Sequence, residues 1–123
     1  MTNHDNRATL HTVYNHVTGA VEGRGLTVAQ AAEIILAHDG STYSIERGDA
    51  SHDMGGESQW WLFSKSANGR WGRTSSVKPI YAISAEAAWP LIAREVLRVC
   101  GEWRLPLSVV TDADYDAMIA EAE

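Results

Sequence analysis

The chain has 123 residues, a formal net charge of −6 and 45% hydrophobic residues. This length and composition favour one folded domain with its own apolar core and exclude a chain that is disordered throughout. The excess of acidic groups argues against a protein that binds nucleic acid over its whole surface, because phosphates repel negative charge.

The cysteine count and the hydropathy of the chain indicate where in the cell the protein is expected. Cys100 is the only cysteine, so no disulfide forms within the chain. No apolar run approaches the roughly 20 residues that a membrane-spanning helix requires. The polar start of the chain also lacks the apolar stretch of a signal peptide. We therefore expect a cytoplasmic protein without membrane contact, with residues 1–6 as a loose N-terminus.

The first periodic segment supports two interpretations. Apolar side chains recur at helical spacing, which predicts a first helix, at Leu10, Val13, Tyr14, Val17 and Val21. The β-branched residues of the same segment, together with Gly19, favour an extended conformation instead. Whether residues 8–22 form a helix or a strand therefore stays open.

A second helix is predicted over residues 28–38. Thr27 and Gln30 have the spacing of a capping box, in which each side chain bonds the backbone of the other residue. The chain then alternates polar and apolar residues over 41–47, which indicates a strand, and residues 48–57 have the composition of a loop.

An aromatic hairpin occupies the middle of the chain. Residues 58–65 and 70–74 predict two strands around a turn at 66–69, and residues 79–83 predict a third strand. The alternation of a strand sends Trp61 and Phe63 to one face and Trp60 and Leu62 to the other. Both faces are therefore apolar, so each is either buried or presented to a partner.

Two further helices complete the chain. Ser84 is expected to cap a helix over residues 85–100, in which Pro90 predicts either a kink or a later start, near Trp89. After an irregular or short extended crossing at residues 103–107, Thr111 is expected to cap an acidic helix over 111–123.

These elements predict an α+β fold in a single domain that spans residues 1–123. We expect a three- to four-stranded antiparallel sheet from residues 41–83, with helices packed on it, in the order α-α-β-β-β-β-α-α. The order helix, three strands, helix across residues 27–100 resembles the topology of double-stranded RNA-binding domains. That family has a lysine-rich start to its last helix, whereas residues 85–89 here read Ala-Glu-Ala-Ala-Trp.

Residues with catalytic or metal-binding chemistry are few and scattered. In the loop 48–57, His52 and Asp53 lie near Asp49 and Glu57, the one place where ligand-type side chains crowd together. Their spacing matches no metal-binding pattern, and the chain lacks the nucleophile, phosphate-loop and zinc motifs of common enzymes. We therefore expect no catalytic residue, no metal and no cofactor, and keep an enzyme without a recognisable motif as a further alternative.

Charge defines two candidate contact surfaces. Residues 58–81 carry four basic and no acidic residues, and residues 111–123 carry five acidic and no basic ones. The first surface joins aromatic anchors to cations, a combination common at binding interfaces, at Trp60, Trp61, Trp71, Arg70 and Arg73. The second is a row of carboxylates on the last helix, at Asp112, Asp114 and Asp116.

In its size, negative charge and acidic segment Asp112-Ala113-Asp114-Tyr115-Asp116, the chain resembles a group of small acidic proteins. These are the anti-defence proteins of phages and mobile elements, anti-CRISPR proteins among them. The resemblance implies a stoichiometric inhibitor that binds a nucleic-acid-handling complex in the host cytoplasm.

We therefore expect a non-catalytic macromolecular-binding protein with a protein partner. A small nucleic-acid-binding domain that uses the hairpin 58–81 is the alternative, because aromatic rings beside cations suit stacked bases and phosphates. A two-fold dimer through Trp60 and Leu62 also stays open.

Overall fold

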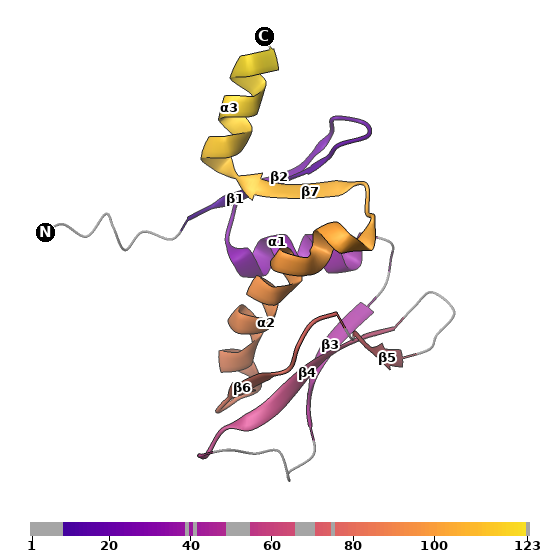
Figure 1. Ribbon diagram of the computed structural model, residues 1–123, viewed down its shortest axis with the longest axis vertical. Helices are drawn as coiled ribbons and strands as arrows, with labels where there is room; N and C mark the ends of the chain where they lie inside the picture. The colour runs from indigo at the N-terminus through magenta and orange to yellow at the C-terminus, as the bar shows by residue number, and fades with distance from the viewer. Residues whose placement is uncertain are drawn as a thin grey trace, which may run out of the picture.

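Two antiparallel sheets enclose a pair of helices (Figure 1). The structure, a computed structural model, describes residues 9–38, 40, 42–48, 55–65, 71–74 and 76–122. The expected loose N-terminus at 1–6, the hairpin turn at 66–69, and His52 and Asp53 lie outside these residues.

The three-stranded sheet joins the beginning and the end of the chain. Its strands follow the order β2-β1-β7, with β1 in the centre. Their bounds are β1 His11–Asn15, β2 Val21–Leu26 and β7 Leu107–Thr111. The central strand pairs with β7 in an unbroken register of five residues, whereas its pairing with β2 contains register shifts.

The four-stranded sheet is built around β4. Its strands are β3 Thr42–Arg47, β4 Ser58–Lys65, β5 Trp71–Arg73 and β6 Ile80–Ala82. β3 pairs with residues 60–65 of β4, and β5 and β6 pair with opposite ends of it. The α+β class and the predicted antiparallel sheet from residues 41–83 are therefore confirmed.

The helices α1 (Val28–Ala37) and α2 (Ala85–Val99) lie against each other between the two sheets. The predicted caps are confirmed. Thr27 and Gln30 form a reciprocal capping box on α1, and Ser84 accepts a hydrogen bond from the Ala87 amide at the start of α2. These bonds satisfy amides that the helix itself cannot pair.

Small side chains let the two helices approach closely. Alanines 31 and 32 of α1 and alanines 88 and 93 of α2 are completely buried. Larger core side chains fill the space toward the sheets, and each full burial of this kind stabilises the fold by about 1.5–3 kcal/mol. The largest of them are Ile35, Leu62, Ile92, Val13, Val77 and Val96. The core is therefore shared by both sheets and both helices.

The segment at residues 11–26 is a β-hairpin, so the predicted first helix is wrong and the extended interpretation holds. Val13 is completely buried whereas Val17 is 75% exposed, which a common helical face would not allow. The turn depends on Gly19, at a φ of 84°, and on Asn15, whose side chain accepts hydrogen bonds from the amides of Val17 and Thr18.

Helix α2 begins at Ala85 and runs through Pro90 to Val99. The later start near Trp89 that Pro90 suggested is therefore wrong. A 3₁₀ turn, Cys100–Trp103, follows, and the expected crossing at residues 103–107 leads into β7. The chain then enters α3 (Asp112–Ala122), which rises away from the three-stranded sheet and has no buried residue (Figure 1).

Candidate contact surface on the four-stranded sheet

The two faces of β4 have different roles. Leu62 is completely buried against the helices, and the Trp60 indole on the same face donates a hydrogen bond of 3.1 Å to the carbonyl oxygen of Ala82. Trp61 and Phe63 point to the opposite face, as the alternation of the strand predicts. The described helices pack on the Leu62 side, so the Trp61 side is the outer face of the sheet.

Directly opposed residues of neighbouring strands share a face of a sheet, so the strand pairings identify the rest of this outer face. Tyr81 of β6 lies opposite Gln59, Arg73 of β5 opposite Phe63, and Trp71 opposite Lys65. We call this surface the aromatic face, and it consists of Gln59, Trp61, Phe63, Lys65, Trp71, Arg73 and Tyr81. Ser44 and Glu46 of β3 border it.

Trp61 is fixed by its neighbours. The guanidinium carbon of Arg73 lies 3.9 Å from the centre of the Trp61 indole, a close cation–π contact. The indole N–H donates a hydrogen bond of 3.0 Å to Gln59, whose amide nitrogen lies 3.4 Å from the hydroxyl oxygen of Tyr81. Arg73 therefore covers one side of the ring, and Gln59 satisfies its polar group.

Trp71 is the exposed indole of the aromatic face. It is 52% exposed, and the ammonium nitrogen of Lys65 lies 5.9 Å from the centre of its ring. Beside it is a depression of about 320 Å³ lined by Ser44, Glu46, Phe63 and Trp71. An exposed indole next to a hollow is an arrangement into which a partner's apolar side chain can fit.

The structure brings together Trp61, Trp71 and Arg73 of the residues expected at the contact surface. Trp60 does not belong to it, because strand alternation turns its ring toward Ala82 and the helices. The two-fold dimer through Trp60 and Leu62 that the sequence left open does not fit this structure, since Leu62 is completely buried. Arg70 lies outside the described residues.

The acidic row on α3 is partly engaged in contacts within the chain. Thr12 donates a hydrogen bond of 2.6 Å to the Asp112 carboxylate, which holds the pKa of that group below its usual range. Asp116 forms an ion pair of 2.9 Å with Arg24. Asp114 is exposed, and its backbone amide donates to the Thr111 hydroxyl, which confirms the predicted cap.

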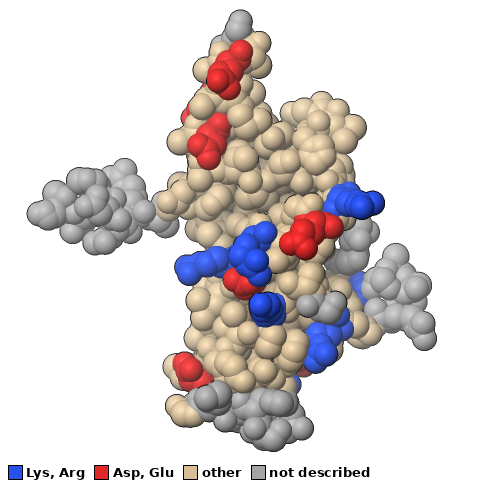
Figure 2. Space-filling model, viewed as in Figure 1, with Lys and Arg blue, Asp and Glu red and all other residues tan. Residues whose placement is uncertain are grey.

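Figure 2 shows acidic side chains along α3 and basic side chains gathered over the middle of the molecule. Since Arg24 offsets Asp116 locally, the contrast in charge is smaller than the sequence suggests. The aromatic face belongs to the other sheet, so the two expected contact surfaces are separate.

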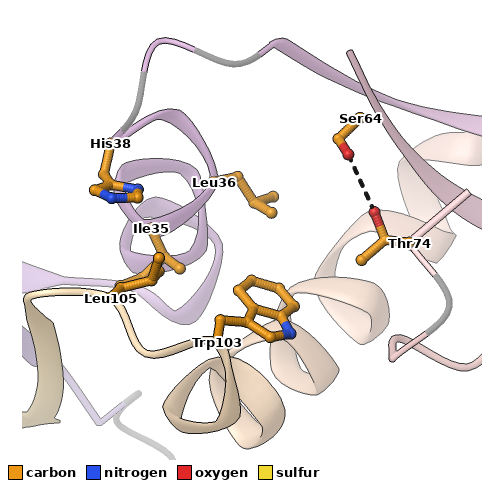
Figure 3. A pocket seen from close by; sticks show the side chains of 7 residues that line it. All are labelled: Ile35, Leu36, His38, Ser64, Thr74, Trp103 and Leu105. Atoms are coloured by element: carbon orange, nitrogen blue, oxygen red, sulfur yellow. Dashed lines mark hydrogen bonds between the residues drawn. The ribbon is translucent and has the colours of Figure 1, made fainter. Parts of the chain in front are cut away.

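A pocket of about 210 Å³ lies between the end of α1 and the four-stranded sheet (Figure 3). Its apolar wall is Ile35, Leu36, Leu105 and the ring of Trp103, and Figure 3 shows Ser64 and Thr74 facing each other across 3.5 Å. Trp103 donates its indole N–H to Ser76. His38 is the one residue among those lining the pocket with an ionisable ring, so the pocket brings no acid and base together.

Among the described residues, no three or more His, Cys, Asp or Glu side chains are placed to hold a metal ion. Nor do these residues form a helix of the length and hydropathy needed to cross a bilayer. In comparisons with protein-family models, curated proteins and solved structures, no match to this chain was found.

The residues expected at the contact surface did not include Gln59. Phe63 was expected on the same strand face as Trp61, and Lys65 and Tyr81 were expected in the basic aromatic hairpin of the nucleic-acid-binding alternative. The alternation that separates Trp61 from Trp60 also selects Gln59, Phe63 and Lys65. Tyr81 required the register between β4 and β6, which no local pattern specifies. The ion pair between Arg24 and Asp116 could not be predicted either, because the two residues meet only in the folded chain.

Proposed function

We propose that this protein is a non-catalytic macromolecular-binding protein that uses the aromatic face to contact a protein partner. The observation that carries the proposal is the exposure of Trp71, at 52%, on a sheet face that no described helix covers. Large exposed aromatic side chains with a neighbouring arginine are the residues that most often dominate the free energy of protein association.

The arrangement of charge supports a protein partner over nucleic acid. Glu46 borders the face, directly opposite Trp61, and would repel a phosphate backbone. Arg73 covers one side of the Trp61 ring, so that side is closed to a stacking base. The net charge of −6 adds an unfavourable long-range term for any nucleic acid.

The resemblance to anti-defence proteins makes a host nucleic-acid-handling complex the partner class we propose. We assign the contact to the aromatic face rather than to α3, because Asp112 and Asp116 of the acidic row already have partners within the chain. A helix that imitates a phosphate row needs carboxylates that are free to meet cations of the other protein.

A photo-crosslinking amino acid at position 71, in cells of the source organism or its host, tests this proposal. The matched control carries the same amino acid at Leu91, an exposed apolar residue of α2, 38% exposed. We expect a protein adduct from position 71 that survives nuclease and that Tyr81→Ala weakens. Equal adducts from both positions, or none from position 71, would contradict the proposal.

Single-stranded nucleic acid is the second candidate, favoured by one observation: each indole of the aromatic face has a cation beside it, Arg73 at Trp61 and Lys65 at Trp71. Such pairs serve bases and phosphates at once. The candidate predicts that a single-stranded oligonucleotide quenches the tryptophan fluorescence, that the effect weakens steeply with salt, and that Lys65→Ala and Arg73→Ala reduce it. No quenching at low salt would exclude it.

A further inference from the structure

The strand β7 has one edge without a partner among the described residues. It pairs with β1 alone, and the amide of His16 bonds the carbonyl of Pro106 while the amide of Asp112 bonds the carbonyl of Leu10. In an antiparallel pair these bonds occur at every second residue. The backbone of Ser108 and Val110 is therefore directed at β1, and that of Val109 is directed away from it.

Leu107 and Thr111 are each two residues from Val109, so their amides also point away from β1. β7 thus presents a row of backbone groups along its outer edge, which is the feature that recruits another strand. This edge is also unprotected. Its sequence, Leu-Ser-Val-Val-Thr, contains no charge, proline or glycine, and its register with β1 is unbroken.

The other edge of the same sheet is protected by contrast. β2 carries Glu22 and Arg24, two glycines, and register shifts against β1. The outer strand of the second sheet, β3, ends in Glu46 and Arg47. Charges and irregular register are the devices with which proteins prevent unwanted strand pairing, so their absence from β7 distinguishes this edge.

A groove of about 480 Å³ runs beside the open edge, between β7 and α2. Val109, Val110 and Leu97 supply its apolar lining, and Arg94 and Arg98 of α2 its cations. Glu95 also lines the groove, where it pairs with Arg98. Figure 2 shows basic side chains gathered in the middle of this view of the molecule.

The cations of the groove are not equally available. Arg98 bonds Glu95 at 2.7 Å, whereas Arg94 is exposed and makes no hydrogen bond or ion pair with the described residues. Asp114 lines the groove as well, on the helix that follows Thr111. On the groove wall, Nδ1 of His11 is buried without a hydrogen-bond partner among these residues, a condition that costs about 1–3 kcal/mol.

We propose that the edge of β7 and the groove beside it bind an extended peptide segment of a partner protein, and that this segment carries a carboxylate opposite Arg94. The peptide would add a fourth strand to the three-stranded sheet. Its backbone would pair with Val109 and its neighbours, and alternate side chains would enter the groove. The surface is distinct from the aromatic face and does not depend on it.

A second copy of the chain is the competing occupant of this edge. Two β7 strands that pair about a two-fold axis would bring Arg94 and Asp114 of both copies to one junction. Amide exchange in the peptide-free protein separates this occupant from a peptide.

A random nine-residue peptide library displayed on phage, selected against the intact protein, tests the proposal. We expect enriched sequences that contain Asp or Glu. In amide hydrogen exchange, Leu107, Val109 and Thr111 should exchange quickly in the free protein and slowly with a selected peptide, whereas Ser108 and Val110 should be slow in both states. Arg94→Glu should weaken binding at least tenfold, and Arg104→Glu, the same charge reversal at an exposed arginine that lines neither the groove nor the aromatic face, should leave it unchanged.

Val109→Pro removes an amide that β1 does not use, so it should abolish binding while circular dichroism stays that of the folded protein. If this variant does not fold, Arg94→Glu and the exchange pattern still decide the matter. The proposal is overturned if no peptide is enriched, if the alternate amides stay unprotected, or if Arg94→Glu binds normally. Slow exchange at Val109 in a peptide-free dimer would also overturn it, because a second copy would then occupy the edge.

Discussion

Thr12 donates a hydrogen bond of 2.6 Å to Asp112, and this contact joins residues one hundred positions apart in the chain. Thr12 is completely buried, and its hydroxyl also accepts a hydrogen bond of 3.1 Å from Nε of Arg24. The same arginine stacks on Tyr115 at 5.2 Å and pairs with Asp116. The start of α3 is therefore fixed to β1 and β2 through one hydroxyl and one guanidinium group.

Replacement of Thr12 by valine, which has nearly the same shape, should destabilise the fold, because Asp112 and Arg24 both lose a hydrogen bond. Urea denaturation would measure this. Thr42→Val changes an exposed threonine of β3 in the same way and should be nearly neutral. Equal midpoints for the two variants would show that the Thr12 hydroxyl does not hold α3.

The pKa of Asp112 is lowered mainly by the hydrogen bond from Thr12. The ionised carboxylate therefore stabilises the folded state above the ordinary value of about 3.9, and this contribution is lost as the pH falls through the lowered pKa. We expect thermal midpoints of wild type and Asp112→Asn to differ most near neutral pH and to converge in acid. Asp114→Asn removes the same charge without that bond, and an identical pH profile for both variants would refute the assignment.

Substitutions of Trp60 and Trp71 should have opposite effects on stability and on partner binding. Trp60→Ala removes a ring packed toward the helices and a hydrogen bond to Ala82, and should cost about 3 kcal/mol of stability. Trp71→Ala should change stability far less, because about half of the side chain is exposed and it lies on the outer face of the sheet, yet it should reduce partner binding. Denaturant titrations and the binding assay should therefore rank the two variants in reverse order.

Cys100 should be chemically inert in the folded protein. Burial raises the pKa of its thiol, and the sulfur lies 3.5 Å from the carbonyl oxygen of Leu97. A thiol-specific chromogenic reagent should react slowly with the native protein and rapidly after denaturation, because only the thiolate attacks. Rapid labelling of native protein would show that the end of α2 opens readily.

The middle of the chain was predictable because its signals are local. Alternation in β4 separates Trp61 from Trp60, and the Thr27 and Ser84 caps mark where α1 and α2 begin. Each of these signals lies within a few residues of the structure it specifies. The placement of Trp71 and Arg73 on the Trp61 face also requires the register between β4 and β5.

The three-stranded sheet could not be predicted in this way. Val13 and Val109 become neighbours only when β1 meets β7, and neither segment carries a strong strand signal by itself. Apolar residues from Leu10 to Val21 happen to match helical spacing, while burial of Val13 in the shared core selects the extended form. Tertiary packing overrides local preference here.

The pairing of β1 with β7 has a consequence for synthesis on the ribosome. Helices α1 and α2 and the sheet around β4 have all been synthesised before residue 103, but β1 must wait for residues 107–111 before it gains its second neighbour. Until translation reaches them, β1 can be held only by β2 and the helices. The three-stranded sheet should therefore be the last part of the core to close.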